Sequence, residues 1–259
     1  MTSFVNRDEF AYKSWNFEIA ESHILKSEGP ERKQFEETLS PLPQIPEMTF
    51  DKNTLRVTHE EGFGFEFTAL DALKLVDAEH DHMKVAISDA WKSTRADSEH
   101  VHEVFKPFDW TFTTSYKGTL LRDGEKAFTV TPTSETIDYA KLKIEEKILF
   151  FASLVLFEDE LADNGASILS LKMRAMDSGY FILLRFYLRV DNVLVRVHDT
   201  RLHCIYDRKY ILREYSVRES AYSSINAPVT DITDSNRIVD YLPLTSRHTE
   251  KLVYPALDS

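Results

Sequence analysis

Hydrophobic and polar residues alternate over short stretches of this chain, which is the pattern of half-buried β-strands. Strict alternation covers residues 15–19 and 63–67. Asp123-Gly124 is a two-residue turn pair typical of a β-hairpin. From residue 154 to 215, strand-like stretches are separated by turn signals. The pattern therefore predicts a long antiparallel meander in the second half of the chain.

Helical periodicity is confined to short segments. Leu70, Leu73 and Val76 recur every three residues and predict a helix that begins near Thr68. A second helix is predicted from about residue 138 to 150, with an aspartate as its N-cap. After residue 225 the apolar density falls and prolines recur, so we expect this tail to wrap the surface. With no repeat or linker, residues 1–259 are expected to form one α+β domain of mainly antiparallel sheet, its core spanning about 15–255.

Composition and charge narrow the function classes. Among the 259 residues, 31 are basic and 43 acidic, a formal net charge of −12, which disfavours binding to nucleic acid or anionic membranes. Glycine occurs only 7 times, and the single G-x-G at 62–64 lacks the further glycines of a nucleotide loop, so we predict no cofactor. Cys204 is alone, which excludes an intrachain disulfide and a cysteine zinc cluster.

No segment has the character of a membrane span or a signal peptide. The most apolar stretch, 148–157, is ten residues long, about half of what a bilayer requires. The first eight residues contain no apolar region of the kind that signal peptides carry. These features predict a soluble, cytoplasmic protein, which we expect to be a monomer.

Two histidine pairs are the most enzyme-like feature. In a strand, His80-Asp81-His82 or His100-Val101-His102 would direct two imidazoles to one face, where a metal can bind. Both pairs lie in polar, acidic segments, where histidines are usually only solvated. We therefore predict no metal site and no catalytic residue, and a metal-dependent enzyme using His80 and His82 is the alternative.

A hairpin at Asp191-Asn192 brings charged residues together. If its turn has two residues, Arg185 lies opposite His198, and the arginines of this strand pair form a cationic face. Such a face could accept an anion or be neutralised by neighbouring acids in solvent. Arg185 and Arg196 would then point away from the face that carries Val197.

Two aspartates each have two interpretations. Asp199 ends an apolar row, so it either pairs locally with Arg201 or Arg213, or lines a cleft. Asp71 stands at the capping-box position after Thr68, where a carboxylate reaches back to the helix start. Spacing alone favours the capping role for Asp71.

Several blocks, in one order, carry a family resemblance. They are Gly62-Phe63-Gly64-Phe65-Glu66-Phe67, Lys106-Pro107-Phe108-Asp109-Trp110-Thr111-Phe112-Thr113-Thr114, Tyr116-Lys117-Gly118-Thr119-Leu120-Leu121, Leu156-Phe157-Glu158-Asp159-Glu160-Leu161, Asp199-Thr200-Arg201-Leu202 and Leu212-Arg213-Glu214-Tyr215. Together they resemble the TOR signalling pathway regulator-like (TIPRL) family, from about Trp15 to Pro255.

The resemblance implies a non-enzymatic regulator that binds the catalytic subunits of type 2A serine/threonine phosphatases, restrains them, and acts in TOR and stress signalling. It also implies a single α+β domain with a cleft that receives the phosphatase's C-terminal tail. A general scaffold of the TOR pathway is a further alternative.

The resemblance implies phosphatase contacts at Asp71, Ile137, Asp199 and Tyr215. A fifth family position, a methionine in the familiar member, is Val197 here, which stays apolar but is shorter. Because Val197, Asp199 and Arg201 alternate on one strand, we expect them to share a face, with Arg201 near the tail's terminal carboxylate. We expect Tyr215 to reach the same cleft from a later strand.

Overall fold

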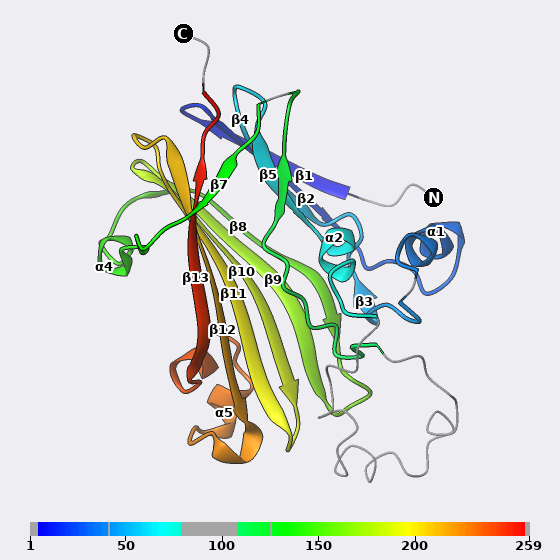
Figure 1. The fold of residues 1–259 in the computed structure, drawn as a ribbon. Helices are drawn as coiled ribbons and strands as arrows, with labels where there is room; N and C mark the ends of the chain where they lie inside the picture. The colour runs from blue at the N-terminus through cyan, green and yellow to red at the C-terminus, as the bar shows by residue number, and fades with distance from the viewer. Residues whose placement is uncertain (1–4, 41, 79–107, 125, 257–259) are drawn as a thin grey trace, which may run out of the picture.

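The computed structural model describes residues 5–40, 42–78, 108–124 and 126–256. Within these ranges the strands form a five-stranded sheet, β1-β2-β4-β5-β6, and an eight-stranded sheet, β3-β8-β9-β10-β11-β12-β13-β7 (Figure 1). Neighbouring strands pair antiparallel throughout both sheets. The predicted α+β class, dominated by antiparallel sheet, is confirmed.

The strands differ in length between the two sheets. The five-stranded sheet consists of β1 (Val5–Tyr12), β2 (Trp15–Ser22), β4 (Thr54–His59), β5 (Gly64–Thr68) and β6 (Thr119–Leu121). The eight-stranded sheet consists of β3 (Met48–Thr49), β7 (Thr129–Pro132), β8 (Ile148–Asp159), β9 (Gly165–Met176), β10 (Gly179–Val190), β11 (Leu194–Ile205), β12 (Tyr210–Ala221) and β13 (Leu244–Val253). The meander predicted over 154–215 corresponds to β8 to β12 and is confirmed.

Helices are few and short. They are α1 (Pro30–Thr38), α2 (Ala69–Leu73), α4 (Tyr139–Leu142) and α5 (Val229–Ile232), with 3-10 turns η2 (Tyr222–Ser224) and η3 (Ile238–Asp240). Thr68 is the N-cap of α2, as its sequence predicts, and its side chain accepts a hydrogen bond from the amide of Asp71. In the part of the chain that the structure describes, no helix is long and apolar enough to traverse a bilayer.

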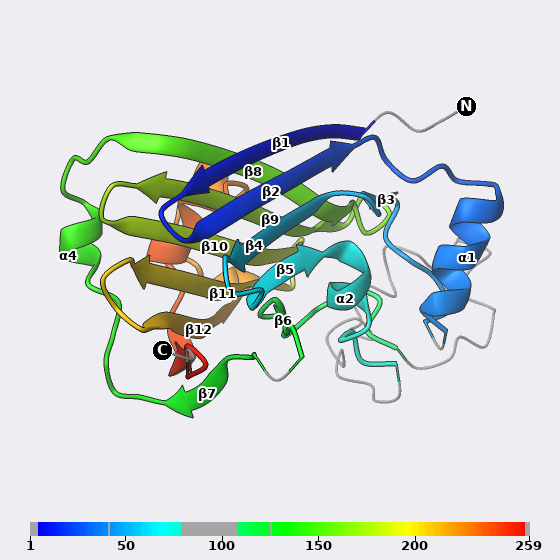
Figure 2. The ribbon, with the colours of Figure 1, turned by 90° about the horizontal axis from the view of Figure 1, so that it is seen from above.

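The two sheets pack face to face through large aromatic side chains, with the five-stranded sheet over one side of the larger one (Figure 2). Tyr180 of β10 has its ring centroid 5.2 Å from that of Phe17 and 5.3 Å from that of Trp15, both on β2. All three rings are buried. Burial of such rings is the main driving force that holds the sheets together.

The eight-stranded sheet has two faces that we name for what they contact. Its inner face, toward the smaller sheet, carries Leu184 and Phe186 of β10. Its outer face carries residues of the opposite parity, including Tyr187 of β10 and Val197 of β11, which pack in a separate cluster with Ile232. The segment 229–242, containing α5 and η3, therefore covers part of the outer face, and α4 lies beside the same sheet (Figure 1).

Three details differ from the sequence-based expectations. Asp123 and Lys126 do form a bridge, but β6 pairs with β5 and β7 pairs with β13, so this turn carries the chain from one sheet to the other. The helix predicted over 138–150 ends at Leu142, because the apolar residues from Ile148 onward pair with β9 instead. Tertiary pairing here outweighs local helical periodicity.

The third difference concerns the C-terminal tail. Part of it covers the sheet surface, as expected, but Leu244–Val253 is β13, which lies between β12 and β7. Its mostly polar and half-exposed residues gave no alternating apolar pattern that would have identified a strand.

Candidate functional site

The β10–β11 hairpin has a three-residue loop, so the predicted two-residue turn is wrong. Val190 pairs with Leu194, and the amide of Val193 donates to the carbonyl of Val190 at 2.9 Å. Asn192 adopts the left-handed conformation with φ 63°, as three-residue hairpin loops require. The extra residue shifts the register by one and brings Arg185 opposite Asp199.

Arg185 consequently lies on the same face as Asp199, not on the opposite one. Its Nε and Nη2 donate to the two carboxylate oxygens of Asp199, each at 2.7 Å. Asp199 is 1% exposed, so this is a buried, bidentate ion pair. Arg196 does lie on the inner face, as expected, where its Nη1 donates to Thr113 at 3.1 Å.

Arg201 completes a buried ionic network with Asp199 as its centre. Its Nη2 donates to Asp199, and its Nη1 donates to Glu214 at 3.2 Å and to Ser216 at 3.0 Å. The hydroxyl of Tyr139, from α4, donates to the same Glu214 oxygen at 2.7 Å, and burial raises the pKa of Tyr139 above its ordinary value. Val197, Asp199 and Arg201 thus share the outer face, as their spacing predicts, but Arg201 is already paired with two carboxylates of the protein.

Val197 does not line an open cleft. It is 1% exposed and packs with Tyr187, Ile232 and Leu242 beneath the segment 229–242. Polar contacts hold the same segment: Tyr187 donates to the carbonyl of Ile232 at 2.7 Å, and Arg185 donates to the carbonyl of Ser235 at 2.6 Å. The expectation of a single cleft walled by Val197 is therefore wrong.

Tyr215 lies on the inner face, opposite to Asp199. It pairs with Thr200 across β12 and β11, and its hydroxyl is 3.2 Å from Nδ1 of His198. Burial raises the pKa of Tyr215 to about 12 and lowers the pKa of His198 to about 4. Lys117 stands 4.7 Å from the centroid of the Tyr215 ring, a cation–π contact. Tyr215 and Val197 consequently cannot meet in one concavity.

Asp71 stands at the start of α2, near the inner-face residues. Its Oδ2 accepts from Thr119 at 2.7 Å and its Oδ1 from Lys74 at 3.1 Å. Burial on its own would raise the pKa of Asp71, but these hydrogen bonds outweigh it and the pKa is lowered. Thr119 also bonds Tyr116 at 2.9 Å, and the Tyr116 carbonyl accepts from Thr200 on β11. Only half of the capping box forms, because the carboxylate turns toward Thr119.

Ile137 lies directly before α4 and is 3% exposed. Its carbonyl accepts from the amide of Tyr139 at 3.1 Å. Ile137 thus anchors the connection that carries Tyr139 to the network on the outer face.

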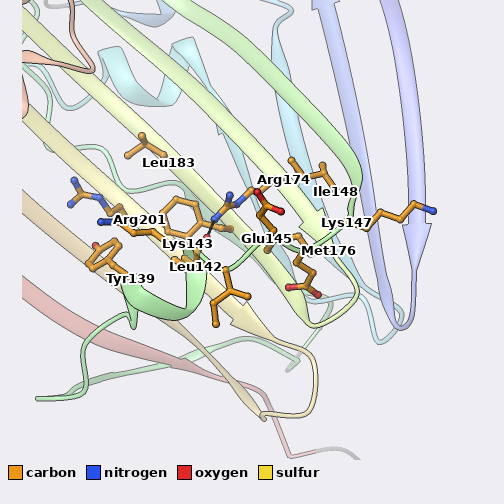
Figure 3. A pocket seen from close by; sticks show the side chains of 13 residues that line it. Tyr139, Leu142, Lys143, Glu145, Lys147, Ile148, Arg174, Met176, Leu183 and Arg201 are labelled. Carbon is orange, nitrogen blue, oxygen red and sulfur yellow. Dashed lines mark hydrogen bonds between the residues drawn. The ribbon is translucent and has the colours of Figure 1, made fainter.

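An open groove of about 860 Å³ adjoins this network on the outer face (Figure 3). Arg201 and Tyr139 line one end, Ile148 and Lys147 lie toward the other, and Arg174 lies between them (Figure 3). Its remaining lining consists of Leu142, Lys143, Ile144, Glu145, Glu146, Met176, Phe181 and Leu183. The groove thus combines apolar side chains with four basic ones on a chain of net charge −12.

The six residues expected at one site are divided between two places. Val197, Asp199 and Arg201 lie on the outer face, with Ile137 beside it, but only Arg201 lines the groove. Asp71 and Tyr215 belong to the inner side, linked through Tyr116 and Lys117. The structure does not test whether any of these residues binds a partner, so each role stays a prediction.

Sequence reasoning placed Arg185 on the wrong face and missed the roles of Glu214, Tyr139 and Arg174. The signal for Arg185 was present, because the shifted register places an arginine directly opposite the aspartate that ends an apolar row. Arg174 gave no signal, since the carbonyl that holds it belongs to Leu142, in a separate segment of the chain. The two histidine pairs lie outside the described residues, and in the ranges that are described no cluster of three or more histidine, cysteine or acidic side chains could hold a metal.

Comparison with known proteins identifies relatives along nearly the whole chain. The TIP41-like family profile matches residues 48–226. A human TIP41-like protein is 46% identical over 248 residues, covering 95% of this chain and 90% of that protein. The Saccharomyces cerevisiae type 2A phosphatase activator TIP41 is 36% identical over 230 residues, covering 80% of this chain and 64% of that protein. The chain therefore belongs to the TIP41-like family.

Proposed function

We propose that this protein is a non-enzymatic regulator of type 2A serine/threonine phosphatases that binds their catalytic subunit. Family membership supports this, because relatives from Saccharomyces cerevisiae and Schizosaccharomyces pombe are both named type 2A phosphatase activators. We place its action in the cytoplasm, in TOR and stress signalling, and as a monomer when free. The resemblance seen in the sequence supports the role in signalling, while the cytoplasmic location and the monomeric state are expectations from the sequence.

The groove on the outer face is the observation that carries the proposal. It is open, it is lined mainly by apolar and cationic side chains, and one of these, Arg201, connects it to Asp199. An extended peptide with apolar side chains and a terminal carboxylate fits such a lining. We propose that the C-terminal tail of the catalytic subunit binds there and that binding restrains the phosphatase.

Capture from lysate with quantitative identification tests the partner. The full-length protein should enrich type 2A catalytic subunits above all other proteins. Enrichment of other TOR-pathway proteins, with no phosphatase, would favour the general scaffold and overturn the proposal.

A turnover assay tests the direction of the effect. Purified catalytic subunit should dephosphorylate a phosphopeptide more slowly when this protein is added in excess. Faster turnover would contradict restraint and agree with the name activator of the yeast relatives, while leaving the proposed partner intact. Hydrolysis by the isolated protein, lost in a His80→Ala variant, would instead favour the enzyme alternative.

A further inference from the structure

Two arginines line the outer-face groove, and their surroundings differ. Arg201 is 14% exposed, and its terminal nitrogens are already bonded to the carboxylates of Asp199 and Glu214. Its charge is therefore balanced within the protein. A partner's carboxylate at Arg201 would have to compete with two buried acids, which is unfavourable.

Arg174 has no such acid. Its Nη2 donates to the carbonyl of Leu142 at 2.7 Å, and its guanidinium carbon lies 5.9 Å from the centroid of the Phe181 ring. These contacts fix the position of the guanidinium without neutralising it. Among the residues that the structure describes, no carboxylate forms a salt bridge with Arg174, and its buried Nε has no hydrogen-bond partner. Because Nε is enclosed, the donors that Arg174 offers to a ligand are the remaining N–H groups of its two terminal nitrogens.

The acids of the groove do not compensate for this charge. Glu146 is engaged elsewhere, since its oxygens accept from the amide and hydroxyl of Ser178 at 2.7 and 2.8 Å. Glu145 and Glu146 together carry two negative charges against the three positive charges of Lys143, Lys147 and Arg174, so this end of the groove keeps a net positive charge. It is also apolar at its rim, where Ile144 is 69% and Ile148 50% exposed.

We propose that Arg174, rather than Arg201, is the residue that receives the terminal carboxylate of a bound peptide tail. A guanidinium that is preorganised by stacking and by one backbone bond loses little entropy on binding a carboxylate through its fork. The side chains that precede the terminus lie against Ile144 and Ile148. Arg201 instead maintains the shape of the opposite end of the groove. This inference rests on the proposed function, because it takes the phosphatase tail as the peptide.

Peptide binding with and without the terminal charge tests the assignment. The probe is a fluorescent peptide with the sequence of the phosphatase tail, made as free acid and as C-terminal amide, and its anisotropy is measured with full-length protein. The wild-type protein should prefer the free acid by about tenfold or more, as a charge-assisted hydrogen bond implies. Arg174→Gln should remove this preference, and Arg174→Lys should restore only part of it, because lysine lacks the fork.

Lys172→Gln is the matched control, since it removes one exposed positive charge from the same strand, β9, outside the groove lining, and should keep the preference. Comparing acid with amide on each variant also separates folding from recognition, because a folding defect weakens both peptides alike. An unchanged preference in Arg174→Gln, or a wild-type protein that does not distinguish the two peptides, would overturn the assignment. If catalytic subunit is nonetheless captured from lysate, the proposed function stands; if none is captured, both fail.

Discussion

Arg185 and Asp199 face each other across the β10–β11 hairpin and form a bidentate ion pair, with the Nε–Oδ1 and Nη2–Oδ2 distances both at 2.7 Å. The pair is buried, and Arg185 extends from it to the carbonyl of Ser235. Asp199 therefore links the sheet to the segment 229–242 that covers it. Because Arg185 and Arg201 both occupy its carboxylate, the contacts that Asp199 makes lie within the protein itself.

Asp199→Asn should lower the free energy of unfolding by about 3–5 kcal/mol, because it leaves the buried Arg185 without an acid and Arg201 with Glu214 alone. Denaturant titration measures the loss. Asp191→Asn is the control in the same hairpin, since it breaks the half-exposed pair with Arg189 and should cost at most about 1 kcal/mol. Equal stability of the two variants would contradict a structural role for the buried pair.

Val197→Asp should destabilise the protein by a similar 3–5 kcal/mol, because it buries an unpaired charge under the segment 229–242. Limited proteolysis should show cleavage within that segment at lower denaturant than in the wild type. Val130→Asp, on exposed β7, serves as the control and should change stability by less than about 0.5 kcal/mol. A folded, resistant Val197→Asp protein that loses phosphatase binding would show instead that Val197 is accessible.

His198 should make stability depend on pH in the acidic range. Burial lowers its pKa to about 4, so between about pH 6.5 and 4 the unfolded chain binds a proton that the folded protein excludes. The contribution of neutral His198 to the free energy of unfolding is therefore complete above pH 6.5 and declines as the pH falls toward 4. Denaturant titration across this window should give a flatter profile for His198→Gln, whereas His248→Gln, at an exposed histidine, should keep the wild-type slope.

Ile144→Asp should weaken binding to the catalytic subunit without unfolding the protein. Its side chain is 69% exposed, so its loss costs little stability, while the new charge removes apolar contact and adds an acid to the groove. Val229→Asp, equally exposed but on α5, is the matched control and should bind normally. Titration calorimetry with purified catalytic subunit compares the two. Equal affinities would move the interface away from the groove.

Local patterns predicted the strands well where one face is buried and the other half-exposed, as in β2 and β5. They failed where a strand is mostly polar, as in β13, or where helical spacing competes with pairing, as at Ile148. In each case the deciding contacts come from distant segments, which a local window does not contain.

In the candidate site, one additional residue in the β10–β11 loop changes which side chains lie on the same face of the sheet. Alternation along β11 correctly places Val197, Asp199 and Arg201 together, because that relation depends only on the strand itself. Which residue lies opposite Arg185 depends on the length of the loop. The left-handed conformation of Asn192 permits a three-residue loop, which shifts the register by one residue. An aspartate opposite an arginine was the chemical signal for the right register.

The position of β13 between β12 and β7 constrains the order in which strands can pair while the chain is being synthesised. β7 is complete by residue 132, yet the strand beside it is β13, which is made more than a hundred residues later. During synthesis, β7 therefore lacks its partner β13 while β8 to β12 can already form their meander of adjacent hairpins. Insertion of β13 between β12 and β7 is a late, long-range event, and until then the nascent chain exposes the edge of β12, to which chaperones would have reason to bind.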